Sequence, residues 1–157
     1  MLNAFAQQLP RLQEENLLGQ TVVLPDAAAG KVAVLVLGFS QASKNPTSAW
    51  AKRISVDYSQ TPGFALYQLA VLEAVPHMFR SMIISGIRKG IPEDQRQNFL
   101  PVVHNEAELQ KLVGFEEADD AYIIVLDRSG KVAYQTHGAS VGPAYVEFRS
   151  ALAGLLK

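Results

Sequence analysis

The sequence predicts an α/β sandwich around a mixed β-sheet, and three observations lead to this fold class. Apolar runs of strand length alternate with helix-forming segments through the first two thirds of the chain. Residues 32–39 form an unbroken apolar run rich in Val and Leu, which is typical of a strand buried on both faces. Residues 122–136 place two apolar runs around an Asp-Arg-Ser-Gly turn, which predicts an antiparallel hairpin.

The first elements follow from local signals. Residues 16–24 predict a small hairpin that turns at Gly19-Gln20, followed by the buried strand 32–39. A helix is expected from Pro46 to about Tyr58, with Trp50, Ile54 and Tyr58 on one face. Residues 65–72 predict a strand. Pro76 then begins a second helix, closed by Gly90 and Pro92, whose apolar stripe is Phe79, Met82, Ile83 and Ile87.

The second half completes the alternation. Residues 99–104 predict a short strand, and the capping-box spacing of Asn105 and Glu108 predicts a helix to about Leu112. Strands at 122–126 and 132–136 flank the turn, and residues 143–156 form the last predicted helix. We expect an N-terminal segment over residues 1–14 and one domain over residues 15–157.

Composition excludes several classes of protein. A chain of 157 residues with 48% hydrophobic and 18% charged residues can bury the core of one domain and is not disordered. The net charge of −1 gives no electrostatic reason to expect nucleic acid binding. No apolar run approaches the roughly 18 residues of a membrane span. The absence of cysteine excludes disulfides, thiolate metal sites and cysteine catalysis.

The N-terminus offers two interpretations. Ala4-Phe5-Ala6 has the small-x-small form of a signal-peptidase site, which predicts a periplasmic or otherwise extracytoplasmic protein. The alternative is a helix over residues 3–11 whose alanines are coincidental, in a cytoplasmic protein.

The order of elements resembles the thioredoxin-like superfamily over residues 15–157. The resemblance rests on the strand that ends in Phe39, the polar loop with Pro46, and "YIIVLDRSGKVAYQTHG" at residues 122–138. It is nearest to membrane-tethered thioredoxins and peroxiredoxins that carry an N-terminal hairpin. The resemblance implies a three-layer sandwich with a mixed central sheet and an N-terminal β-hairpin.

The redox residues of that superfamily are replaced here. Lys44 to Thr47 occupy the place of Cys-x-x-Cys, so Lys44 and Thr47 stand where the family has cysteines. Ala121 stands where the family has a cis-proline. The resemblance therefore implies neither thiol oxidoreductase nor thiol peroxidase activity. Because a cis bond before a residue other than proline costs about 2.5–4 kcal/mol, we expect a trans Asp120–Ala121 bond.

Three segments are similar to a narrower family: "FSQASKNPTSAW", "YQLAVLEAVPHMFRSMIISGIRKGIP" and "DDAYIIVLDRSGKVAYQTHG". They resemble bacterial relatives of the mitochondrial ATP synthase assembly factor ten family, whose fold is thioredoxin-like without the redox cysteines. This resemblance implies a chaperone or assembly module that needs no cofactor and binds a protein partner. In the mitochondrial members that partner is membrane-associated.

Two surfaces are candidates for partner binding. The first is a groove at the former redox position, lined by Ser43, Lys44, Asn45, Pro46, Thr47, Trp50, Asp120, Ala121 and Tyr122. The second is a face of the predicted helix 76–90, where flexible apolar side chains adjoin basic ones. It comprises Phe79, Arg80, Met82, Ile84, Arg88 and Lys89.

The residues that could form a catalytic or metal site also have simpler interpretations. His77, His104 and His137 show no ligand spacing, so we expect surface or capping histidines and no metal. The acidic residues between 105 and 120 fit a solvated loop. The Ser43-Lys44-Thr47 loop leaves one alternative function, an enzyme with a non-cysteine mechanism. The competing interpretation is that Ser43, Asn45 or Thr47 caps the following helix.

Overall fold

The computed structural model describes residues 8–157 and contains one five-stranded sheet in the order β5-β4-β3-β6-β7. Central β3 (Val32–Gly38) pairs parallel with β4 (Phe64–Val71) and antiparallel with β6 (Ala121–Leu126). β5 (Phe99–Val102) and β7 (Val132–His137) form the two edges. Every residue of β3 and β6 is buried, which confirms the prediction of a strand covered on both faces.

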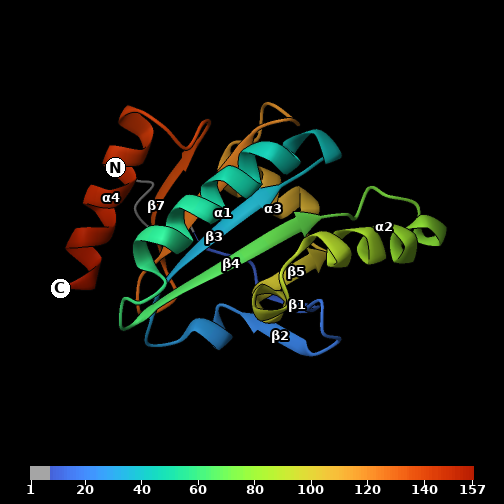
Figure 1. Cartoon of the computed structure of the whole chain (residues 1–157), viewed down its shortest axis with the longest axis horizontal. Coiled ribbons are helices and arrows are strands. Elements are labelled where there is room, and N and C mark those ends of the chain that lie inside the picture. The colour runs from blue at the N-terminus through green and yellow to red at the C-terminus, as the bar shows by residue number, and fades with distance from the viewer. Residues whose placement is uncertain (1–7) are drawn as a thin grey trace.

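Side chains alternate along β3, so the strand contributes to two separate cores. Val32, Val34 and Val36 pack with residues of α1 (Lys44–Tyr58) and α4 (Pro143–Leu156), among them Trp50 and Phe148. Figure 1 shows α1 lying along β3 on this face of the sheet.

The opposite face is covered by the N-terminal hairpin and by α3 (Glu106–Val113). Its strands are β1 (Leu12–Glu15) and β2 (Thr21–Leu24), which pair antiparallel. Leu35 of β3 packs in one core with Leu12, Leu24 and Leu109. Helical layers on both sides of a mixed sheet, with a hairpin before it, match the predicted architecture.

Helix α2 (His77–Gly90) has a different environment from the other helices. None of its 14 residues is buried, whereas α1, α3 and α4 each bury two or three apolar side chains. Figure 1 shows α2 (yellow-green) extending away from the sheet beyond the arrowhead of β4.

Several predicted boundaries differ from the observed ones. The first hairpin strand is Leu12–Glu15 rather than part of 16–24, because residues 16–20 form the turn. The expected domain boundary after residue 14 therefore falls within β1. Helix α1 starts two residues before Pro46, and a proline in the first turn is tolerated because that N–H has no intrahelical partner. A 3₁₀ helix at Glu93–Asn98 was not predicted.

The predicted N-terminal features lie mostly outside the described residues. The predicted cleavage motif Ala4-Phe5-Ala6 lies outside the described residues. Of the alternative helix over residues 3–11, the described part, residues 8–11, is not helical, so that part of the prediction is wrong.

Candidate functional site

The structure brings together the two segments of the groove that was predicted at the former redox position. Gly38 at the end of β3 pairs with Ala121 at the start of β6. The loops at this end of the two strands are joined because the Ser40 hydroxyl donates a hydrogen bond to the Ala118 carbonyl. Helix α1 begins beside them at Lys44. A Cβ on Gly38 would collide with Ser43 Oγ, so glycine permits this close approach.

Four of the nine predicted groove residues are buried: Ser43, Trp50, Ala121 and Tyr122. The Trp50 indole N–H donates to the Gly138 carbonyl at 2.7 Å. The Tyr122 hydroxyl accepts the backbone N–H groups of Glu116 and Glu117. These side chains support the surrounding loops from inside. The solvent-accessible members are Lys44 and Asn45, with Pro46, Thr47 and Asp120 partly exposed.

The hydroxyls of this loop donate to backbone carbonyls. Ser43 Oγ donates to the Ser40 carbonyl at 2.6 Å, and Thr47 Oγ1 lies 2.9 Å from the Ser43 carbonyl. A helix-capping hydroxyl would instead accept a backbone N–H, and α1 has no such side-chain cap, so the capping prediction is wrong. A hydroxyl whose proton lies on a carbonyl is also not activated as a nucleophile.

Asp120 and His137 form a polar pair at the same end of the sheet. The Asp120–Ala121 bond is trans, as predicted. One carboxylate oxygen of Asp120 accepts the Ala121 N–H at 2.8 Å, and the other lies 2.9 Å from His137 Nδ1. The imidazole is 61% exposed and stacks on the Tyr122 ring. Sequence reasoning missed this pair, because it depends on the register that places His137 opposite Tyr122.

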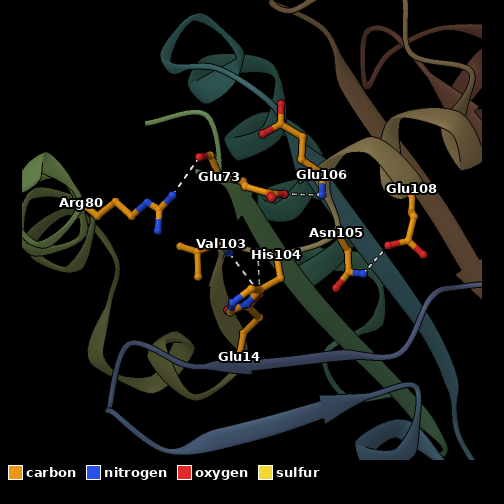
Figure 2. Close-up of polar contacts among 8 residues, drawn as sticks. All are labelled: Glu14, Glu73, Arg80, Val103, His104, Asn105, Glu106 and Glu108. Atoms are coloured by element: carbon orange, nitrogen blue, oxygen red, sulfur yellow. Dashed lines mark hydrogen bonds and ion pairs between the residues drawn. The ribbon is translucent and has the colours of Figure 1, made fainter. Parts of the chain in front are cut away.

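Glu14 joins the hairpin to the end of β5. Its carboxylate is 4% exposed and accepts the backbone N–H groups of Val103 and His104, each at 3.1 Å, while the His104 imidazole lies 3.1 Å away (Figure 2). His104 is therefore a structural partner of Glu14. Within residues 8–157, no three His, Asp or Glu side chains are arranged to hold a metal ion.

The acidic residues at the start of α3 also have structural partners. Glu73 accepts the Glu106 N–H at 2.8 Å (Figure 2). Glu106 in turn accepts the Ala74 N–H. Asn105 has a left-handed backbone (φ 68°), and its side-chain amide donates to Glu108. The predicted helix is present, but the predicted capping box does not form.

Helix α2 presents an exposed apolar face. Met78 is 78% exposed, Met82 66% and Phe79 47%. Met78 was not among the predicted surface residues, although its i, i+4 spacing to Met82 places both on one stripe. Ile84 is only half-buried, on a different side of the helix.

The predicted basic residues of α2 have separate roles. Arg80 donates to the carbonyls of Val75 and Glu73, and Arg88 donates through Nε to the Leu17 carbonyl at 2.9 Å. The Arg88 bond fixes the C-terminal end of α2 against the turn of the N-terminal hairpin, while the Arg80 bonds join the start of α2 to the segment just before it. Lys89 is exposed at the C-terminal turn.

No helix within residues 8–157 combines the length and the apolar character that a membrane crossing requires.

In comparisons with known proteins, no curated protein matches this chain in sequence.

Solved structures with low sequence identity share the fold. A putative thiol:disulfide interchange protein DsbE from Chlorobium tepidum is 20% identical, with a TM-score of 0.63 and 96% of each chain covered. A SCO1/SenC family lipoprotein from Bacillus anthracis is 17% identical, with a TM-score of 0.62 and again 96% of each chain covered. The exposed lipoprotein thioredoxin Etrx1 from Streptococcus pneumoniae is 13% identical, with a TM-score of 0.63, covering 92% of this chain and 99% of that one.

These similarities confirm the predicted thioredoxin-like fold, here in a chain without cysteine. A family model described as ATP10 protein matches residues 3–146, which is most of the sequence. The chain therefore belongs to the ATP10 protein family.

Proposed function

We propose that this chain is a redox-inactive module of assembly type, which binds a protein partner. Membership of the ATP10 family and a thioredoxin-like fold without cysteine support this function. At the former redox position Trp50, Ala121 and Tyr122 are internal, and no large apolar side chain is exposed among the nine groove residues. The alternative of a non-cysteine enzyme lacks support, because the hydroxyls of Ser43 and Thr47 bond to carbonyls.

The exposed face of α2 carries this proposal. An amphipathic helix normally hides its apolar residues in the core, yet α2 buries none of its residues. Met78, Phe79 and Met82 form one contiguous exposed surface, which we call the α2 stripe. Unbranched methionine side chains adapt to irregular partner surfaces, which makes them common at binding sites. The α2 stripe is therefore the proposed site of partner contact.

The test is capture of partners by the tagged full-length protein in cells of its own host. Met82→Glu places a charge in the α2 stripe, while Val146→Glu makes the same change on α4 at a side chain of equal exposure, 67% against 66%. The proposal predicts that a protein captured by the wild type is lost with Met82→Glu and retained with Val146→Glu. Identical capture by all three proteins would refute it.

We also propose an extracytoplasmic location, on the basis of Ala4-Phe5-Ala6. Mass spectrometry of the native protein then finds a mature N-terminus at or near Gln7 in an extracytoplasmic fraction. A cytoplasmic product that retains residues 1–6 would contradict this location.

A further inference from the structure

The charged side chains of α2 are all basic. Between residues 74 and 92 the sequence contains Arg80, Arg88 and Lys89 together with His77, and it contains no acidic residue. Two of these cations, Arg88 and Lys89, lie in the last turn, where they also oppose the negative end of the helix dipole. A surface of this charge is complementary to carboxylates.

Lys89, the exposed cation of α2, lies in line with the α2 stripe. At about 100° per residue, Met78, Met82 and Lys89 fall within a narrow sector of α2, with Phe79 beside them. A partner helix lying along the α2 stripe would therefore meet an apolar surface first and Lys89 at its end. This is the arrangement that an amphipathic helix with acidic flanks matches.

The arginines favour discrete carboxylates over a diffuse anionic surface. Arg80 and Arg88 are fixed by carbonyls of the protein itself, and these bonds leave N–H donors of both guanidiniums unused. A guanidinium held in one orientation is preorganised for bidentate bonding to a carboxylate. Carbonyl-bound arginines are also less free to extend toward lipid headgroups.

The surroundings of α2 also disfavour an anionic membrane. Glu73 precedes the helix, and Glu93 and Asp94 follow it closely. These exposed acids reduce the positive charge that a planar anionic surface spanning the whole of α2 would meet. A partner helix lying along the α2 stripe can avoid both acidic ends.

We infer that the α2 stripe receives an amphipathic helix of a protein partner, whose apolar face is bordered by acidic side chains. This inference rests on the proposed partner-binding function and specifies the chemistry of the partner. Met78, Phe79 and Met82 supply the apolar contact, and Lys89 meets the acidic border at the end of the stripe. The guanidinium of Arg88, about 80° from Met78 around the helix, adds donors on one flank, whereas Arg80 lies about 160° from Met82 and faces away from the α2 stripe.

The experiment uses two synthetic 18-residue helical peptides with the same Leu/Met face, one flanked by Glu and the other by Lys. Their binding to the full chain is measured by fluorescence anisotropy at low salt. The Glu-flanked peptide is expected to bind at least tenfold more tightly. Lys89→Glu should remove most of that preference, whereas Lys111→Glu, the same change at an exposed lysine of α3, should leave it intact.

Equal affinity for the two peptides, or binding of neither, would overturn the inference. Cosedimentation with phosphatidylcholine vesicles containing one quarter phosphatidylglycerol tests the membrane directly. Sedimentation that requires Met82, without any peptide preference, would assign α2 to a lipid surface instead. Failure of the inference is separable from failure of the proposed function, because the host capture experiment with Met82→Glu does not depend on the charge of the partner.

Discussion

The buried Glu14 carboxylate should be a principal attachment of the N-terminal hairpin, and Glu14→Ala tests this. The substitution removes the acceptor for the Val103 and His104 N–H groups and the partner of the His104 imidazole. Hydrogen bonds to a charged group contribute about 1.5–3 kcal/mol, and buried donors left without an acceptor cost about 1–3 kcal/mol.

The expected loss is about 2 kcal/mol, toward the lower part of these ranges, because the His104 imidazole is largely exposed and can be hydrated in the variant. For a domain of this length, such a loss lowers Tm by roughly 4–8 °C. Glu14→Gln keeps one acceptor oxygen and should lose about half as much.

Thermal and urea unfolding, followed by the far-ultraviolet circular dichroism of the full chain, measures these differences. Glu15→Ala serves as the control, because Glu15 is the exposed neighbour on the same strand. If Glu14→Ala unfolds within about 0.5 kcal/mol of Glu15→Ala, a range typical of surface substitutions, Glu14 does not hold the hairpin.

Three further predictions concern other parts of the chain. Burial, together with the hydrogen bond that its hydroxyl donates to Asp57 at 2.7 Å, raises the pKa of Tyr145. The stability that the neutral Tyr145 hydroxyl contributes is present below the ordinary pKa of 10.0 and is lost as pH rises through the raised pKa. Tyr145→Phe should therefore lower the free energy of unfolding by about 1 kcal/mol at pH 7. The same variant should show a weaker decline of Tm at alkaline pH. Partial burial of Asp127 acts to raise its pKa, but hydrogen bonds from Ser129 and Lys131 outweigh it and lower the pKa below 3.8. The stability that Asp127 contributes is therefore present above pH 3.8 and is lost as pH falls through the lowered pKa. Asp127→Asn should have a lower Tm than the wild type at pH 7, and this difference in Tm should shrink below pH 3.8. A difference in Tm that stays constant with pH would contradict this. The purified protein should show no insulin-disulfide reductase or peroxidase turnover above a buffer blank, since it forms no thiolate; turnover that persists after removal of contaminating thioredoxin would contradict this.

The parts of the fold that were predictable are those with a local physical cause. The continuous apolar run of β3 requires cover on both faces, and the structure provides it. Pro76 and Pro92 define the ends of α2, because proline favours the start of a helix and holds the residue before it, here Ile91, in an extended conformation. The β6–β7 hairpin follows from the Asp-Arg-Ser-Gly turn, where Gly130 has φ of 86°.

The candidate site was less predictable because exposure is decided by tertiary placement. Apolar spacing along α2 is the same whether that face meets the core or solvent, and only the position of α2 beyond the sheet leaves Met78 and Met82 exposed. Conversely, Trp50 and Tyr122 lie at the former redox position in sequence but belong to the core. The pairing of Glu14 with His104 spans 90 positions, and no local pattern encodes it.

Site-specific photocrosslinking in the native host tests the central claim most directly. A benzoylphenylalanine placed at Met82 samples the α2 stripe, and one placed at Val146 samples an equally exposed position on α4. The account predicts a discrete crosslinked protein adduct from Met82 and none of the same mass from Val146. Equal adducts from both positions, or an adduct from Val146 alone, would contradict the assignment of α2 as the partner-binding surface.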